Sequence, residues 1–190
     1  MKFNNPIVIG GLGGSGTRVV AELLKKQSIY IGGILNKAND NLLFSRLFKR
    51  PLWLAASQAK DIHLHLSTFE KYMEGKRWTV QDCLRYFNSS PKYIPGQKFR
   101  MRLGYQFMLH QFFKFNQSRP NKWGWKEPNS HIFLPYLIDY FKDLKYIYVV
   151  RHGLDMAFSK NQQQLVNWGP LFGIEPPHSP LAQFNYWLAA

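Results

Sequence analysis

The chain contains a single cysteine, Cys83, among its 190 residues. One cysteine cannot form an internal disulfide, which excludes the small disulfide-stabilised secreted domains and fits a reducing compartment. No apolar run approaches the roughly 20 residues that a membrane-spanning helix needs. The first residues also lack the apolar core of a signal peptide. From these absences we expect a cytoplasmic location.

Acidic residues are also scarce, with 11 Asp and Glu against 25 Lys and Arg, and the formal net charge is +14 at pH 7. Such an excess favours an anionic partner: a nucleotide, a sulfated or phosphorylated substrate, nucleic acid or an acidic membrane surface. Charge alone does not rank these partners. Aromatic residues, at 16% of the chain, indicate a globular rather than a disordered protein. The length suits one well-buried domain.

The most informative stretch is a glycine-rich segment near the start of the chain. A β-branched run at 7–9 leads into the glycines of 10–16, and an amphipathic helix is expected over 17–26. A glycine turn between a strand and a helix N-terminus exposes backbone N–H groups, and the helix dipole adds positive potential there. Side chains would hold an anion away, and parts of such a turn favour positive φ. The segment therefore predicts a phosphate site.

Two common phosphate-binding patterns fit this segment poorly. Counted from Gly11, a threonine and an arginine stand where a Walker A motif needs lysine and then serine or threonine. The dinucleotide fingerprint G-x-G-x-x-G is met by Gly11, Gly13 and Gly16. The acidic residue expected about 20 residues later is missing, because Leu35 and Asn36 occupy that region. An NTP–magnesium enzyme is thus disfavoured, and an NAD(P)-dependent oxidoreductase remains an alternative.

The last third of the chain alternates between predicted strands and helices. Strands are expected at 123–126 and 145–150, and helices at 130–141 and 153–164. This alternation predicts a parallel sheet covered by helices on both faces. Ligands bind such sheets beyond the carboxyl ends of the strands. The glycine-rich turn and the residues that follow both strands are expected to meet at that edge.

Two stretches resemble elements of the sulfotransferases that use 3′-phosphoadenosine 5′-phosphosulfate. Residues 14–18, with the sequence GSGTR, resemble the 5′-phosphosulfate loop of that family. Residues 146–159 resemble its 3′-phosphate element, with Arg151 at the end of a buried strand and Ser159 eight residues later on the next helix. A forked guanidinium and a hydroxyl at a strand–helix junction suit a doubly charged phosphate.

A third stretch strengthens the resemblance. Lys126-Glu127-Pro128 resembles a Lys–acid–Pro element that lies between the other two motifs in some sulfotransferases, notably those that act on protein tyrosine. The three motifs occur along the chain in the same order as in the family. The chain also resembles the bacterial members of the family and those that act on glycans. The matches cover about residues 7–24 and 123–164 and do not extend to the middle of the chain.

The resemblance implies a fold and a domain organisation. The family has a P-loop-like, three-layer α/β fold with a central parallel sheet and helices on both faces. We expect one domain, with a core at 1–43 and 120–190 and a helical insertion at about 44–118. The chain ends within a predicted helix, so we expect a C-terminal part to be missing. Relatives close over the adenosine with that part, and whether this chain is active without it stays open.

The resemblance also implies how the donor would be bound, without a metal ion. Arg151 and Ser159 carry over as ligands of the 3′-phosphate. Arg18 would lie just inside the helix that follows the loop. The cradle for the 5′-phosphosulfate would be formed by N–H groups and hydroxyls of five consecutive residues, Gly13, Gly14, Ser15, Gly16 and Thr17.

In-line transfer of the sulfuryl group to a hydroxyl or amine also needs a cation for the leaving oxygen and a base for the acceptor proton. Lys126 carries over as the cation. Asp40, in a polar turn after the loop helix, is our first choice of base, followed by Glu127 and then by His63 and His65. No further ligands cluster near the two histidines, so they do not predict a metal site.

One departure from the family stands in the loop itself. Many sulfotransferases have a lysine or arginine where this chain has Gly14, and that cation stabilises the leaving group. In this chain Lys126 or Arg18 would have to stabilise the leaving group instead. The acceptor is not predicted, although the basic charge would suit an anionic glycan. The oligomeric state is not predicted either.

A non-catalytic basic module is the second alternative. Residues 98–117 form a basic and aromatic amphipathic segment, which we interpret mainly as a helix with one face in the core. Contact of this segment with a membrane surface is the less favoured interpretation. No recognised nucleic-acid motif accompanies the charge, so nucleic acid is not expected as a partner.

Overall fold

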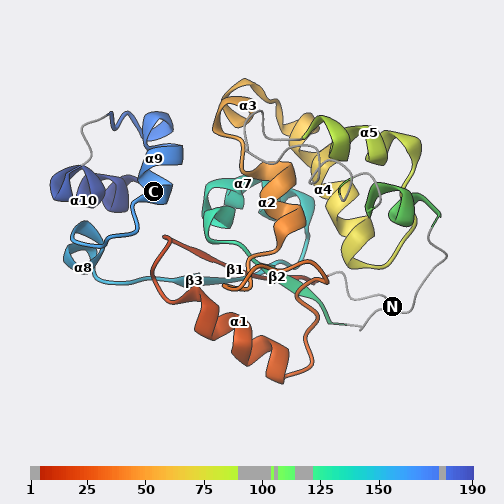
Figure 1. The fold of residues 1–190 in the computed structure, drawn as a ribbon, viewed down its shortest axis with the longest axis horizontal. Helices are drawn as coiled ribbons and strands as arrows, with labels where there is room; N and C mark the ends of the chain where they lie inside the picture. The colour runs from red at the N-terminus through yellow and green to blue at the C-terminus, as the bar shows by residue number, and fades with distance from the viewer. Residues whose placement is uncertain (1–4, 90–103, 105–106, 114–121, 176–178) are drawn as a thin grey trace. The chain divides into compact units, whose positions relative to one another are not determined.

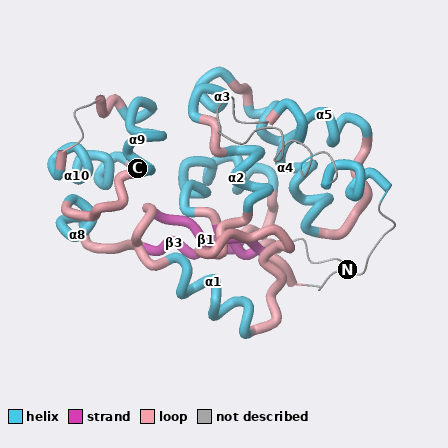
Figure 2. Tube along the Cα trace, viewed as in Figure 1, coloured by secondary structure: helices cyan, strands magenta, loops and turns pink. Residues whose placement is uncertain are grey.

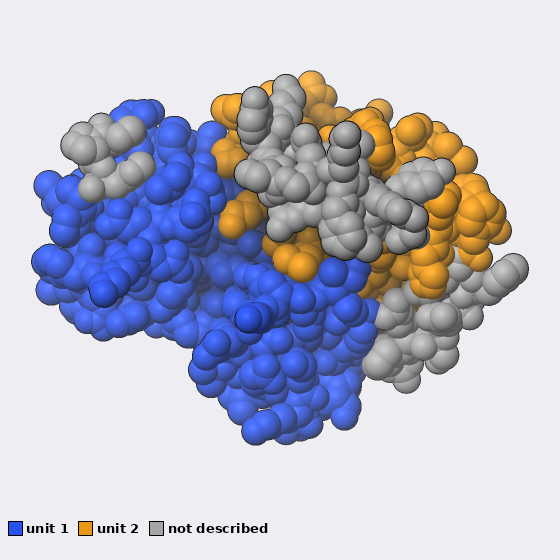
Figure 3. Space-filling model, viewed as in Figure 1, with its two compact units in different colours: residues 1–41, 122–190 blue, residues 42–121 orange. Residues whose placement is uncertain are grey.

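The computed structural model describes residues 5–89, 104, 107–113, 122–175 and 179–190. The chain divides into two compact units, one made of 1–41 and 122–190 and the other of 42–121, which are coloured separately in Figure 3. The first unit contains the glycine-rich turn and every strand of the sheet. The second unit is helical throughout its described elements.

The first unit is built on a parallel sheet of three strands (Figures 1 and 2). The strands are β1 (Ile7–Gly11), β2 (Gly124–Lys126) and β3 (Lys145–Val149), in the order β2-β1-β3. Both pairs are parallel, so the three carboxyl ends lie at one edge of the sheet. The predicted α/β fold with a parallel sheet is confirmed.

Helices cover both faces of this sheet, as Figure 1 shows. Ile9 points to one face, where it forms a buried cluster with Ala21 of α1 (Thr17–Lys26). The neighbouring residue Val8 points to the other face, which carries η1 (Pro128–Phe133) and α7 (Leu134–Tyr140). Residues 8–11 of β1 are all buried, because successive side chains point to opposite faces and both faces are covered.

Four short elements follow β3: α8 (Gly153–Ala157), α9 (Gln163–Trp168), η2 (Gly169–Phe172) and α10 (Pro180–Ala189). α10 packs against α8. A Cβ atom at Gly153 would lie within 2.9 Å of the rings of Phe184 and Trp187. Glycine at this position therefore allows the two helices to approach closely.

The single helix predicted over 153–164 is wrong, because α8 ends at Ala157. Ser159 Oγ accepts a hydrogen bond from Asn161 N at 3.2 Å, and Asn161 Oδ1 accepts one from Gln163 N at 3.4 Å. Such side-chain acceptors compete with the helical ladder for backbone N–H groups. Ser159 consequently lies in the turn after α8 and not on a helix, as the sequence had led us to expect.

A second predicted helix also differs in detail. The helix expected over 130–141 is divided between η1 and α7, and Pro135 stands in the first turn of α7, where its missing N–H costs no helical bond. The stretch 28–35, whose apolar pattern is compatible with a strand or an extended segment, contains isolated bridges at Tyr30 and Leu35. Positive φ angles at Ser28 and Gly32, of 57° and 114°, interrupt the extended backbone there.

The second unit contains α2 (Leu42–Phe48), α3 (Pro51–Ala56), α4 (Ala59–Met73), α5 (Val80–Asn88) and helical residues at 107–113. The basic segment predicted at 98–117 lies outside the described residues except at these positions and at 104. Among the described helices of both units, none has the length and apolar character needed to cross a membrane.

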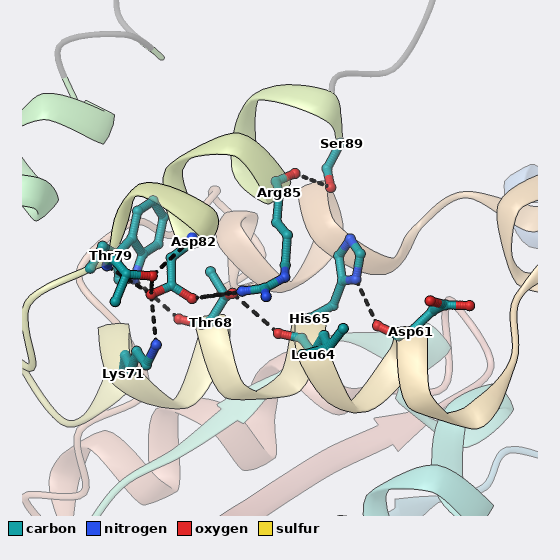
Figure 4. A network of polar contacts seen from close by, with 10 residues as sticks. Asp61, Leu64, His65, Thr68, Lys71, Thr79, Asp82, Arg85 and Ser89 are labelled. Carbon is teal, nitrogen blue, oxygen red and sulfur yellow. Dashed lines mark hydrogen bonds and ion pairs between the residues drawn. The ribbon is translucent and has the colours of Figure 1, made fainter.

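The second unit is held together by a buried carboxylate at the start of α5. The sequence places Thr79 three residues before Asp82, a spacing typical of a helix start, and in the structure their side chains and backbone N–H groups form a reciprocal capping box. Asp82 is fully buried and also accepts from Thr68 Oγ1 at 2.8 Å, Lys71 Nζ at 2.6 Å and Arg85 Nη1 at 3.0 Å. Figure 4 shows these side chains converging on the carboxylate from α4 and α5.

The environment of Asp82 lowers the pKa of its carboxyl group. Burial alone would raise the pKa, but the hydrogen bonds from Lys71, Thr79 and Thr68 outweigh that effect. A carboxyl with a depressed pKa in the folded state stabilises the fold above its ordinary pKa, and the contribution is lost as the pH falls through the folded value.

We therefore expect Asp82→Asn to destabilise the protein by about 2–4 kcal/mol at pH 7, because Lys71 and Arg85 lose their anionic partner. Denaturant unfolding followed by circular dichroism measures this loss. The difference from the wild type should begin to shrink as the pH falls below about 4, the ordinary pKa of an aspartate, and should vanish only below the lower pKa that Asp82 has in the folded protein. Asp61→Asn is the matched control, since Asp61 occupies the same capping-box position in α4 but is exposed. A comparable loss in both variants would contradict the role of the buried network.

Candidate functional site

The glycine-rich turn between β1 and α1 presents free backbone donors. Gly14 and Gly16 adopt positive φ angles of 97° and 100°, which glycine tolerates at little cost. Within the described part of the chain, no acceptor binds the N–H groups of Gly14, Gly16, Thr17 or Arg18. The last three stand at the N-terminus of α1, where the helix dipole favours an anion. The turn thus has the donors that a phosphate or sulfate group needs.

Close packing beneath the turn also requires glycine. A Cβ atom at Gly11 would overlap the carbonyl oxygen of Val149, and one at Gly10 would overlap the Tyr146 hydroxyl. Burial raises the pKa of the Tyr146 hydroxyl, and nearby Tyr148 and Glu127 add to the rise. The Tyr146 hydroxyl is therefore neutral at physiological pH and supports the turn by contact.

Arg151 and Ser159 both approach the turn at Gly14. Arg151 Nη1 lies 3.4 Å from Gly14 O, and a Cβ atom built on Gly14 would lie 3.8 Å from Ser159 Oγ. The guanidinium is half exposed, and its Nε lies 3.4 Å from Asp155 Oδ2. Trp187 Nε1 donates to Arg151 O at 3.0 Å and fixes the backbone there. Three residues from the two predicted phosphate elements therefore lie together at the carboxyl edge of the sheet.

Lys126 and Asp40, which we selected for separate reasons, form one ion pair. Lys126 Nζ donates to Asp40 Oδ1 and, at 3.2 Å, to Ala38 O. The Lys126 side chain is 3% exposed and the Asp40 side chain 20%. The turn that carries Asp40 is itself ordered, because Asn36 Oδ1 accepts from the N–H groups of Ala38 and Asp40 at 2.8 and 2.9 Å. The predicted charge stabiliser and the predicted base are thus direct neighbours.

Glu127, the second candidate base, is buried and points into the protein. Its two carboxylate oxygens accept hydrogen bonds of 2.7 Å from Asn129 N and Asn129 Nδ2, which caps η1. Asn129 Oδ1 accepts from Gln164 Nε2 at 2.7 Å, and Gln164 Oε1 accepts from Gly13 N at 2.5 Å. The N–H of Gly13, assigned to the phosphate cradle from sequence, is therefore engaged inside the protein.

Sequence reasoning missed Asn129 and Gln164. Asn129 follows the Lys–acid–Pro stretch and could have been proposed as a capping partner of Glu127. Gln164 is one of three consecutive glutamines, and no local signal distinguishes it from its neighbours. Its role depends on a contact with Gly13, which is 151 positions away in the chain.

The histidines selected from sequence lie elsewhere. His63 and His65 belong to α4 in the second unit, and His65 Nδ1 is hydrogen-bonded to Asp61 O at 2.8 Å. Burial lowers the pKa of His65. His131 lies in η1 with its Nδ1 2.8 Å from Pro128 O. Among the residues that the structure describes, no three His, Cys, Asp or Glu side chains form a group able to hold a metal ion.

No protein-family model, no curated protein and no solved structure matches this chain. The chemistry of the site therefore has to be inferred from its own residues. One anion position is defined by free N–H groups at the start of α1, and a second by the Arg151 guanidinium beside Ser159. Two such positions at one sheet edge suit a ligand with two separate phosphate groups.

Proposed function

We propose that the chain is a sulfotransferase domain with a P-loop-like fold. It transfers the sulfuryl group of 3′-phosphoadenosine 5′-phosphosulfate to a hydroxyl or amine acceptor. The observation that carries this proposal is the meeting of Arg151 and Ser159 with Gly14. A nucleotide that carries phosphate on both its 3′ and 5′ positions has the charge distribution that these two neighbouring anion positions favour.

In this proposal, the two ends of the donor are held by different parts of the first unit. The free N–H groups of Gly14, Gly16, Thr17 and Arg18 bind the 5′-phosphosulfate at the helix N-terminus. Arg151 and Ser159 bind the 3′-phosphate. No cation stands at position 14, where a positive φ of 97° would strain a longer side chain.

Lys126 supplies the charge that this loop lacks. An ammonium group has three donors, and Ala38 and Asp40 take two of them. The third can stabilise the bridging oxygen of the donor as negative charge develops there. The acceptor oxygen or nitrogen attacks sulfur in line, and the bond between sulfur and the 5′-phosphate oxygen breaks. The acceptor proton passes to the Asp40 carboxylate, and 3′,5′-phosphoadenosine leaves.

The burial of Glu127 favours Asp40 as the base. Both oxygens of Glu127 are occupied by Asn129, whereas Asp40 is partly exposed. A base must reach the proton that it abstracts. The acceptor itself stays unassigned, and an anionic glycan is one acceptor that the net charge of +14 would suit.

Isothermal titration calorimetry of the full chain tests the donor class. We expect 3′,5′-phosphoadenosine to bind and both NADH and ATP–Mg²⁺ to bind much more weakly. A transfer assay with labelled donor and a panel of sugars, phenols and amines then tests the reaction, and EDTA should not reduce its rate. Tight binding of NADH alone would favour an oxidoreductase, and a magnesium requirement would favour a kinase. Binding of the bisphosphate without any transfer would favour a non-catalytic module.

A further inference from the structure

The buried chain of hydrogen bonds behind the phosphate-binding turn connects three side chains from two segments far apart in sequence. It runs from the Glu127 carboxylate through the Asn129 and Gln164 amides to the backbone N–H of Gly13. All three side chains belong to buried residues. Each step is between 2.5 and 2.7 Å.

We call this chain of hydrogen bonds from Glu127 to Gly13 the relay, and the Glu127 carboxylate determines which atom donates at each step. The carboxylate of Glu127 can only accept, so Asn129 must donate through Nδ2 and keeps its oxygen for Gln164. Gln164 must in turn donate through Nε2, which leaves Oε1 to accept from Gly13. The backbone N–H of Gly13 can only donate, so the other end of the relay requires the same amide orientations.

The relay and Arg151 hold the same short part of the turn from two ends. Gln164 accepts from the N–H of Gly13, and Arg151 lies against the carbonyl of Gly14. Glycines have the largest backbone freedom of any residue, so a turn rich in them needs such anchors to keep its N–H groups aimed in one direction. No acceptor among the residues that the structure describes binds the N–H of Gly14 or those at the start of α1, which leaves them available to an anion.

We propose that Gln164 is a positioning residue for the 5′-phosphosulfate cradle, oriented by Asn129 and Glu127. It fixes Gly13 so that the N–H groups that follow are pre-organised for the anion. Because Glu127 directly follows Lys126, the relay also connects the cradle with the strand end that carries the charge stabiliser. This inference rests on the proposed function in one respect, namely that the turn binds the 5′ end of the donor.

The test compares two ligands that differ in the 5′-phosphate. Gln164→Met has a similar volume but removes both hydrogen bonds. It is expected to weaken 3′,5′-phosphoadenosine about tenfold, because the Gly13 N–H loses its acceptor and the cradle loses its order. Adenosine 3′-monophosphate, measured by displacement titration, should bind the variant and the wild type within about twofold, because it makes no contact with the cradle.

Two further variants separate positioning from general stability. Gln163→Met is the matched control: Gln163 is exposed on the same helix, its side chain donates to Asn167 four residues later, and its substitution should change the binding of neither ligand. Asn129→Leu breaks the relay one step from the turn and should reproduce the selective loss in weaker form. Hydrogen–deuterium exchange provides a ligand-free readout, since the amide of Gly13 should exchange faster in Gln164→Met than in Gln163→Met.

The outcomes distinguish this inference from the function on which it rests. A selective loss for the bisphosphate with faster exchange at Gly13 supports the positioning role. Equal weakening of both ligands, or unchanged exchange at Gly13, overturns it and leaves the proposed function intact. Failure of the wild type to bind 3′,5′-phosphoadenosine overturns the proposed function and the inference together.

Discussion

Arg151→Ala is expected to weaken the binding of 3′,5′-phosphoadenosine by about 10- to 100-fold and to leave 5′-AMP nearly unaffected. The guanidinium stands beside Ser159 at the edge of the sheet, where a 3′-phosphate would accept its forked donors. The 5′-phosphate would be bound by backbone N–H groups that the substitution does not remove. Calorimetric titration of both nucleotides against both proteins measures the selectivity directly.

Two control substitutions test whether the effect depends on the guanidinium group itself and not only on its positive charge. Lys160→Ala removes the same charge from an exposed position one residue after Ser159 and is expected to have a small effect that salt abolishes. Arg151→Lys keeps the charge but loses the planar fork and should fall between the wild type and Arg151→Ala.

A different pattern would assign Arg151 another role. Its Nη1 also lies 3.4 Å from Gly14 O, so the side chain could act by holding the turn. In that case 5′-AMP and the bisphosphate would lose affinity equally, because both depend on the turn. Equal losses would therefore remove Arg151 from the 3′-phosphate site and leave it with a structural contact.

Local patterns in the sequence predicted the features that depend on neighbouring residues. The strand, turn and helix over 7–26 are set by propensity, by glycine conformation and by contacts between residues a few positions apart. The break after α8 also has a local cause in Ser159 and Asn161, but their competition with the helix is weak and easily overlooked.

The meeting of the glycine-rich turn with Arg151 follows from the parallel sheet, but the individual side-chain pairings between distant parts of the chain could not be predicted. Lys126 and Asp40 were both selected, yet their pairing joins residues 86 positions apart and depends on the way the turn after α1 folds back on β2. The anchoring of Gly13 by Gln164 spans 151 positions and uses a residue with no distinctive context. Side chains that act through such contacts become visible only once the sheet has brought their segments together.

Because Lys126 is more deeply buried than Asp40, removing either partner of the ion pair should change the free energy of unfolding by a different amount. Asp40→Asn leaves an ammonium group that is 3% exposed without its counter-ion, and we expect it to destabilise the protein by about 2–4 kcal/mol. Lys126→Met leaves the 20%-exposed carboxylate, which water can still solvate, and should cost about 1 kcal/mol. The double variant removes both charges and should be more stable than Asp40→Asn alone. Denaturant unfolding of the three variants measures the asymmetry.

Lys126→Met, which should cost little stability, is expected to have a large effect on the transfer reaction. Lys126→Met is expected to lower the rate of sulfuryl transfer by about 100- to 1,000-fold while 3′,5′-phosphoadenosine still binds, because charge develops on the bridging oxygen only in the transition state. Lys25→Met is the control, since Lys25 forms an exposed pair with Glu22 that should contribute little. If Lys126→Met lost donor binding and transfer in the same proportion, Lys126 would act as a ground-state ligand. If it changed stability alone, the ion pair with Asp40 would serve only to hold the turn against the sheet.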